Sequence, residues 1–268
     1  MAGKSARLSA KSDGKAVAIE ALAVIDGIPV ENELLLGLPA KECERVFPRL
    51  VFVQLRRHDV LHEPGAAIKF AYFINSGLAS VLSVMTDGKS VEVGLTAKEG
   101  FVGLPLIVGL ATSPTRTVVQ IQGDAFRVSA AALAQLLEQC PTLGKRMQRY
   151  VQILAMQATH VAACNRIHEV NERLARWLLS CQDRIDSNTV ALTHEILAQM
   201  LGTRRSSVTV AAGQLQKAGL ITHHSGVVHI ESRARLLQVA CECYESMRRQ
   251  ARNWQNEARS GDDAGLAQ

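Results

Sequence analysis

The chain has 268 residues, of which 47% are hydrophobic, and it carries a formal net charge of +5. This length suits two domains with a connector, and the positive charge suits a polyanionic partner. No run approaches the roughly 18 apolar residues that a membrane-spanning helix needs, so we expect no membrane partner. The six cysteines are scattered over segments of helical pattern, and no secretory leader is visible. We therefore expect a cytoplasmic protein with reduced thiols.

The N-terminal half changes character along its length. Residues 1–15 lack an apolar core and are predicted to be a disordered basic tail, whereas residues 16–49 have a weakly amphipathic helical pattern. Short β-prone runs then alternate with turn residues up to Val128. The runs cover residues 51–55, 71–74, 79–84, 90–95 and 117–121, with turn signals at 63–65, 75–77, 87–88 and 122–124. This spacing predicts a barrel or sandwich, and Asp87-Gly88 is the strongest hairpin signal. A short helix is expected at 130–139.

A long helix is predicted for residues 141–167, opened by Pro141. Side chains recur along it at alternating steps of four and three residues, and most of them are apolar. The predicted dimer-interface residues on this seam are Leu143, Met147, Tyr150, Leu154 and Val161. Because one helix cannot bury such a seam alone, we expect a homodimer. The alternative is packing against the β-rich domain, and a second stripe with Val151, Ile153 and Ala155 allows both arrangements.

Two short amphipathic helices are predicted between Thr193 and Gly219. Thr193 is a suitable N-cap for the first helix, and Gly202 falls where that helix needs a left-handed residue. The second helix begins near Arg204. β-prone runs at 220–222 and 227–230 follow, with a turn between them. This order predicts a winged helix-turn-helix.

The exposed face of the second helix carries the candidate functional residues. The predicted DNA-contacting residues are Thr193, Arg204, Arg205, Ser206, Ser207, Thr209 and Val210. Arginines at a helix N-terminus oppose the helix dipole, which indicates an external anion such as a DNA phosphate or a guanine edge. A solvated helical hairpin is the alternative. From Thr193 to Arg259 there are nine Lys or Arg and five Asp or Glu, so most of the positive excess lies here.

Residues 199–209 and 215–221 resemble the DNA-binding domain of the Crp/Fnr family of bacterial transcription regulators, because helix, turn, helix and wing occur in the same order. The resemblance implies an α+β fold with an N-terminal β-roll, a long dimerisation helix and a C-terminal winged helix-turn-helix. It implies a homodimer on a near-palindromic double-stranded DNA operator, with RNA polymerase as a further partner. By motif position, Arg205, Ser206 and Val210 match the family's base-reading positions, and Arg205 keeps the expected basic type.

The β-rich region is similar to the cyclic-nucleotide-binding roll of the same family. The similarity includes Pro64-Gly65, Tyr72-Phe73, Gly77, Asp87-Gly88 and 101–103. It implies that Gly103, Arg116 and Thr117 form an effector site. Leu104, however, stands where ligand-binding members have a ribose-binding glutamate, and leucine cannot accept a hydrogen bond. Cyclic nucleotide binding is therefore doubtful, and no cofactor is certain. The alternative to an effector-binding role for Arg116 is a surface or salt-bridging arginine at a strand end.

The expected domains are a tail at 1–15, a sensor roll with flanking helices at 16–140, a dimerisation helix at 141–167, a DNA-binding domain at 168–256 and a tail at 257–268.

An effector-binding module with little DNA binding is the alternative function. An enzyme is not expected, because no nucleophile–base pair, metal box or phosphate loop emerges. Cys241 and Cys243 lie two residues apart on a helix predicted from 232 to 256, so they should face different ways, and no metal site is expected.

Overall fold

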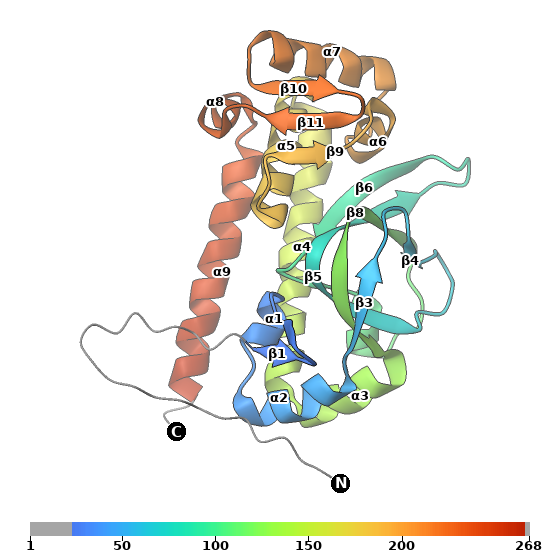
Figure 1. The fold of residues 1–268 in the computed structure, drawn as a ribbon, viewed down its shortest axis with the longest axis vertical. Helices are drawn as coiled ribbons and strands as arrows, with labels where there is room; N and C mark the ends of the chain where they lie inside the picture. Colours follow the sequence, from blue (N-terminus) through green and yellow to red (C-terminus); the bar gives the residue numbers. More distant parts are fainter. Residues whose placement is uncertain (1–22, 266–268) are drawn as a thin grey trace, which may run out of the picture.

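The β-rich segment forms a roll beside a long central helix, in a computed structural model that describes residues 23–265, with side chains to 258 (Figure 1). The predicted tail at 1–15 lies outside the described residues. The strands of the roll are β3 (Val51–Leu55), β4 (Val60–His62), β5 (Phe70–Val84), β6 (Ser90–Thr96), β7 (Phe101–Val102) and β8 (Thr115–Ser129). They are antiparallel in the order β3-β8-β5-β6, with β4 on β8 and β7 on β5.

Two predicted turns in the roll are wrong. Residues 75–77 lie inside β5 and residues 122–124 lie inside β8, where the register between the two strands shifts. The backbones approach so closely there that a Cβ on Gly123 would lie 2.2 Å from the Ser76 carbonyl oxygen. The glycines therefore bend two long strands instead of ending them. The hairpin at Asp87-Gly88 is confirmed, with Gly88 at a φ of +83°.

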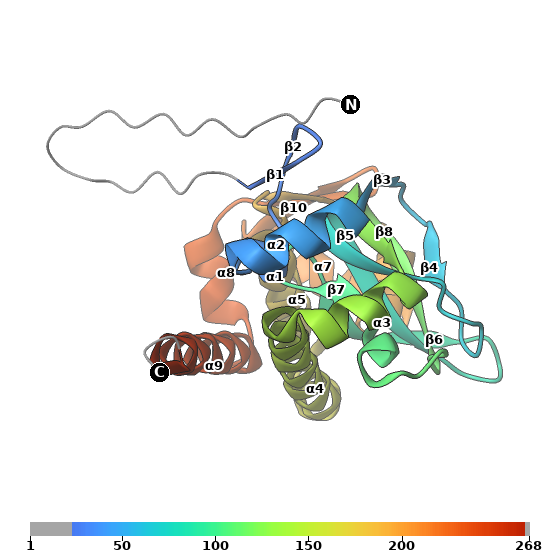
Figure 2. The same ribbon diagram turned by 90° about the horizontal axis from the view of Figure 1, so that it is seen from below.

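Helices close the lower end of the roll (Figure 2). In place of the helix predicted for 16–49, the described residues form a small hairpin and three short helical turns. These elements are β1 (Val24–Ile25), β2 (Ile28–Pro29), α1 (Glu33–Leu36), α2 (Ala40–Val46) and η1 (Phe47–Arg49). The predicted helix at 130–139 is confirmed as α3 (Ala130–Gln139), which Ser129 caps by accepting from the Ala132 N–H.

The central helix α4 (Pro141–Ile167) has the predicted bounds. No acidic residue lies in its first turn, but the buried Glu42 of α2 reaches it from a distance. The backbone N–H groups of Thr142 and Leu143 donate to the two carboxylate oxygens of Glu42, each at 2.9 Å. This carboxylate satisfies two orphan donors and complements the helix dipole. The chain thus fixes the start of α4 through a tertiary contact.

The DNA-binding segment predicted from 168 lies at the far end of α4 (Figure 1). Its elements are α5 (Val170–Ile185), β9 (Thr189–Ala191), α6 (His194–Met200), α7 (Arg205–Lys217), β10 (Ile221–His224), β11 (Val227–Ile230) and α8 (Arg233–Val239). Its core is continuous with the roll, because Leu78, Leu82 and Leu95 pack in one apolar cluster with Trp177 and Leu178. Among the described residues, no helix combines the length and apolar character that crossing a lipid bilayer requires.

The C-terminal segment differs from the single helix predicted for 232–256. The first helix, α8, ends at Val239, its C-cap residue Ala240 is extended with a ψ of 142°, and α9 (Cys243–Gly265) starts after a break. The tail predicted at 257–268 is helical as far as Gly265. In both views α9 lies beside α4, on a different side from the roll (Figures 1 and 2). The break therefore turns the chain back along the central helix.

Candidate nucleic-acid interface

The first helix of the predicted helix-turn-helix is capped as its sequence predicts. The Thr193 hydroxyl accepts a hydrogen bond from the Ile196 N–H at 3.3 Å, and Glu195 lies in the first turn of α6. Gly202 then takes the left-handed conformation, with a φ of +56°. The small Ala198 is buried at the crossing of α6 and α7. The two helices thus meet at the glycine-containing turn that the motif requires.

The first turn of α7 has free hydrogen-bond donors. Arg204 is the N-cap residue but makes no side-chain capping bond, and the first turn contains no acidic residue. Within the described chain, neither Arg204 nor Arg205 makes a side-chain hydrogen bond or an ion pair. Exposed N–H groups and two unpaired guanidinium groups form a site suited to an anion.

Six of the seven predicted contact residues lie on one side of α7 and its N-cap, and the seventh, Thr193, caps α6. Arg204, Arg205, Ser206 and Thr209 are exposed, and Val210 keeps 62% of its surface exposed. The half-buried member of the set is Ser207. The opposite face of the helix is buried through Val208, Ala211, Ala212 and Leu215. Val210 therefore presents its methyl groups to solvent on the face opposite the buried one.

Two predicted contact residues already have internal bonds. The Thr209 hydroxyl donates to the Arg205 carbonyl oxygen and shares a second bond with Nδ1 of His194, both at 3.0 Å. The Thr193 hydroxyl is engaged in its cap. The sequence analysis missed His194, whose ring stacks on His223 of the wing at 4.3 Å. Burial lowers the pKa of His194, and nearby His223 and Arg205 add to this effect, so the stacked ring is held neutral.

The wing is confirmed as a hairpin of β10 and β11. Ser225 and Gly226 form its two-residue turn, both at positive φ (48° and 75°), which matches the right-handed strand twist. The sequence analysis did not predict the strand at 189–191: β9 adds a third strand by pairing with β11. Its signal was weak, because three residues carry little periodicity.

The roll contacts the helix-turn-helix directly. A groove of about 1230 Å³ separates the hairpin at residues 85–91 from α6 and the start of α7. At its edge, the Gln199 side chain donates to the Ser90 hydroxyl. A Cβ on Gly202 would lie 2.8 Å from Cγ2 of Val91. A movement of this hairpin would therefore reach the turn that positions α7.

A buried carboxyl also joins the two domains. Glu92 on β6 accepts from the Trp177 indole N–H of α5 at 2.8 Å and from the Ser80 hydroxyl at 2.7 Å. Burial raises the pKa of Glu92 to about 7, against the lowering effects of these two donors and of Arg176 and Arg184. Sequence reasoning missed this pair, because an acid in a β-prone run reveals nothing of a partner 85 residues away.

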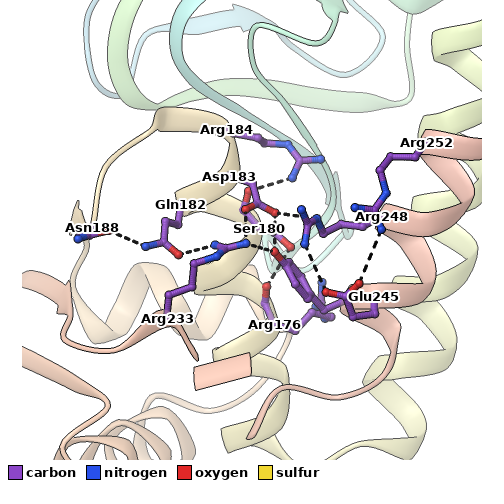
Figure 3. Close-up of polar contacts among 11 residues, drawn as sticks. Arg176, Ser180, Gln182, Asp183, Arg184, Asn188, Arg233, Glu245, Arg248 and Arg252 are labelled. Carbon is purple, nitrogen blue, oxygen red and sulfur yellow. Dashed lines mark hydrogen bonds and ion pairs between the residues drawn. The ribbon is translucent and has the colours of Figure 1, made fainter. Parts of the chain in front are cut away.

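Polar contacts hold the last two helices on α5, as Figure 3 shows around Asp183. Arg233 of α8 approaches the Asp183 carboxylate to 2.7 Å, and Arg248 of α9 approaches it to 3.5 Å. The Tyr244 hydroxyl donates to the same carboxylate at 2.6 Å. On the other side, Arg233 donates to the Gln182 side-chain oxygen at 2.5 Å. The start of α9 is thereby fixed to the DNA-binding domain.

The predicted effector residues lie at two places on the roll. Gly103, at a φ of +105°, precedes the short helix η2 (Leu104–Val108). Nε of Arg116 donates to the Glu63 carboxylate at 2.7 Å, and Thr117 shares a hydrogen bond with Nε2 of His62 at 2.9 Å. The salt-bridge alternative therefore describes Arg116 in this structure.

The predicted dimer seam needs correction. Leu143, Met147, Tyr150 and Leu154 are buried within one chain, against the roll. The Tyr150 hydroxyl donates to the Thr96 hydroxyl at 2.9 Å. The fifth residue, Val161, is half-buried and lines a cavity beside α9. The apolar heptad stripe is thus used for packing inside the chain, which was the stated alternative.

Comparison with known proteins agrees with both halves of the chain. The cyclic nucleotide-binding domain model matches residues 52–140, and the Crp-like helix-turn-helix domain model matches residues 172–239, together more than half of the chain. No curated protein matches the sequence.

Three of the solved structures that match illustrate the shared fold. A Crp/Fnr-family transcriptional regulator from Eubacterium rectale is 15% identical over 78% of this chain and 98% of its own, with a TM-score of 0.62. The c-di-GMP-responsive regulator CLP from Xanthomonas campestris is 18% identical over 72% of this chain and 100% of its own, with a TM-score of 0.61. FixK2 from Bradyrhizobium japonicum is 15% identical over 72% of this chain and 98% of its own, with a TM-score of 0.62. At these identities the structures establish the fold, and the two domain models establish the family. The chain belongs to the Crp/Fnr family of DNA-binding transcription regulators.

Proposed function

We propose that this regulator acts as a homodimer whose two α7 helices enter successive major grooves of a near-palindromic operator. In such dimers the half-sites lie about 34 Å apart. The observation that carries the proposal is the exposed, basic and acid-free first turn of α7, whose two arginines have no internal partner among the described residues.

Individual roles follow from position on α7. Arg205 projects from the first turn and suits the O6 and N7 atoms of a guanine. Arg204, Ser206 and Ser207 lie beside the uncapped N–H groups, where phosphate oxygens are best bound. Val210 is placed one turn on and suits a thymine methyl group. Thr193 and Thr209 contribute mainly by holding the two helices in place, since their hydroxyls are already bonded.

The dimer interface is proposed for the exposed side of α4 instead of the buried seam. Its exposed residues again recur at steps of three and four. They are Lys145, Gln148, Gln152, Ala155, Thr159, Ala162 and Arg166. The small side chains in the middle of this stripe permit close approach of a second helix, and half-buried Val151 flanks them. The roll and α9 cover the other sides of α4.

The DNA role is tested on duplexes selected from a random pool by the full-length protein. Arg205→Ala should lose ~1–3 kcal/mol per half-site on the selected duplex and relax the preference at one base pair. Lys217→Ala is the matched control, because it removes the same charge from the other end of α7. Equal losses for both variants on selected and random duplexes would contradict base reading by Arg205.

The dimer is tested by sedimentation. Ala155→Glu should produce monomers and abolish operator binding, because it places paired charges at the proposed centre of the interface. Ala131→Glu, on the exposed side of α3, is the control and should leave the mass unchanged. A monomeric wild-type chain, or a dimeric Ala155→Glu variant, would contradict the proposed interface.

Within this proposal the protein works in the cytoplasm, where it meets double-stranded DNA and RNA polymerase. Binding of an effector at its site in the roll changes the position of α7, and the change is transmitted through the hairpin at 85–91 and through Glu92. The occupant of that site is an effector other than a nucleotide that needs a ribose-binding glutamate, since Leu104 offers no acceptor. Transcription from a promoter carrying the selected duplex, with and without the Arg205→Ala variant, measures the regulatory output.

A further inference from the structure

Four potential metal ligands converge where α4 ends. Cys164 and His168 come from the last turn of α4, and Cys241 and Cys243 come from the break between α8 and α9. The sulfur atoms of Cys164 and Cys241 are 3.5 Å apart, and the Cys243 sulfur lies 3.7 Å from Nδ1 of His168. All four donor atoms lie within 4.8 Å of one another. The cluster is therefore compact enough for a single ion.

The local backbone explains the convergence. Cys164 and His168 are four residues apart, so they lie on the same face at the end of α4. The sequence analysis placed Cys241 and Cys243 on different faces of one helix, but α8 ends at Val239 and α9 begins at Cys243. Both sulfurs can therefore turn towards α4. The three cysteine side chains are buried, and that of His168 is 13% exposed.

The donor set and its spacing match one metal in particular. Three thiolates and one imidazole are a typical ligand set for structural Zn²⁺, and a tetrahedron with Zn–S distances of about 2.3 Å has S–S edges of about 3.8 Å. The 3.5 Å between the Cys164 and Cys241 sulfurs is close to that edge length, and the 3.7 Å from the Cys243 sulfur to Nδ1 of His168 is close to the somewhat shorter S–N edge. All four positions are filled by protein atoms, so the site has no open place for a substrate.

A second shell supports this assignment. Nδ1 of His168 faces the sulfurs, while its Nε2 lies 3.0 Å from the Glu242 carboxylate. A carboxylate on the far nitrogen of a ligating histidine fixes the ring and makes it a stronger ligand. The sequence Cys241-Glu242-Cys243 thus supplies two ligands and the residue that orients a third.

Buried positive charge lies near the sulfurs. Three thiolates and Zn²⁺ leave a net charge of −1, and the guanidinium groups of Arg173 and Arg176 are nearby and each 5% exposed. Nε of each arginine has no hydrogen-bond partner among the described residues. These two buried guanidinium groups therefore offset the negative charge of a site with three thiolates.

Two other accounts explain less. Plain packing of free thiols, with Met247 and Met156 alongside, does not require His168 to aim a ring nitrogen at the sulfurs. A disulfide between Cys164 and Cys241 requires an S–S distance near 2.05 Å and leaves Cys243 and His168 without a role.

We propose that Cys164, His168, Cys241 and Cys243 bind one structural Zn²⁺ ion. The ion ties the start of α9 to the end of α4, next to His168 and Glu169, where the chain passes from the central helix into the DNA-binding domain. Because Asp183 already fixes Tyr244 and Arg248 to α5, the ion completes a brace across this hinge.

The test starts with the metal content of the full-length protein purified under reducing conditions. We expect one zinc per chain by elemental analysis, and we expect Cys164→Ser and Cys241→Ser each to lose it. Cys140→Ser is the matched control, because Cys140 is a buried free cysteine far from the cluster and should keep its zinc. The reduced apoprotein titrated with Co²⁺ should show the intense visible bands of a tetrahedral thiolate site.

If the serine variants fail to fold, the Glu242→Gln variant provides a second test of zinc binding. It removes only the carboxylate that orients His168, and it should weaken Zn²⁺ binding about 10- to 100-fold in a chelator competition. The proposal is overturned if reduced wild-type protein binds neither Zn²⁺ nor Co²⁺. It is also overturned if a Cys164–Cys241 disulfide forms in place of metal binding, or if both serine variants keep a full zinc equivalent.

Discussion

The recognition helix α7 and the effector cassette of the roll use their arginines in different ways. Arg204 and Arg205 project from an uncapped helix start with no internal partner in the described chain. Arg116 of the cassette is paired with Glu63, and its neighbour Thr117 is bonded to His62. The first arrangement leaves charge for an external ligand, whereas the second satisfies it within the fold.

The sequence alone does not distinguish an arginine that contacts a ligand from one that is paired inside the fold, and this difference does. An arginine at a motif position is a ligand contact only if its guanidinium is available, and a carboxylate in bonding distance removes that availability. DNA contact at α7 requires no rearrangement of a side-chain ion pair, whereas an anion at Arg116 must first compete with Glu63. The hairpin at 85–91 and Glu92 lie where the roll meets the DNA-binding domain.

The largest expected effect concerns Glu92, which links the two regions. Its pKa is about 7 in the folded chain and 4.5 in the unfolded one, so between these values the folded state holds the extra proton. Stability should therefore fall as the pH rises from about 4.5 to 7, by on the order of 3 kcal/mol in total. Glu92→Gln should remove this part of the slope, as measured by urea unfolding at several pH values.

Glu44→Gln is the control for this measurement, because Glu44 is an exposed carboxyl on α2. It should keep the wild-type slope. If Glu92→Gln keeps it too, then Glu92 is ionised in the folded protein and the joint between roll and DNA-binding domain is not sensitive to pH.

A smaller effect is expected for Arg204→Ala. We expect loss of one phosphate contact per protomer, which lowers affinity about fivefold per half-site near 0.15 M salt and reduces the salt slope by about one. The loss should be the same on selected and random duplexes, in contrast to Arg205→Ala. Fluorescence anisotropy across a salt series measures both quantities, and a sequence-dependent loss would make Arg204 a base-reading residue.

The smallest effect is expected for Glu63→Gln. The pair with Arg116 is partly exposed, so its removal should change stability by less than about 1 kcal/mol. Calorimetry should detect no cyclic AMP binding to wild type or variant, because Leu104 still offers no acceptor. Asp87→Asn, which removes the exposed ion pair with Lys89, is the control. Micromolar binding of cyclic AMP to the wild-type chain would contradict this view of the cassette.

Local pattern was enough to predict the elements whose causes are local. Helices α3 and α4 have the predicted bounds, Thr193 caps α6, and the hairpin at Asp87-Gly88 is present. The exposed face of α7 was also predictable, because its buried positions repeat at helical spacing. The predictions were wrong where distant segments decide, as at Gly123, which bends a strand because Ser76 passes close to it.

Sequence pattern was sufficient for the order of roll, central helix and winged helix-turn-helix, and for the set of side chains offered to DNA. These depend on capping, turn residues and periodicity, which act over a few neighbouring positions. Three features depend on the folded chain: which face of α4 is buried, which arginine is already paired, and the meeting of two cysteines from the α8–α9 break with Cys164 and His168. Such contacts join residues tens of positions apart, and their geometry depends on how whole helices and strands pack.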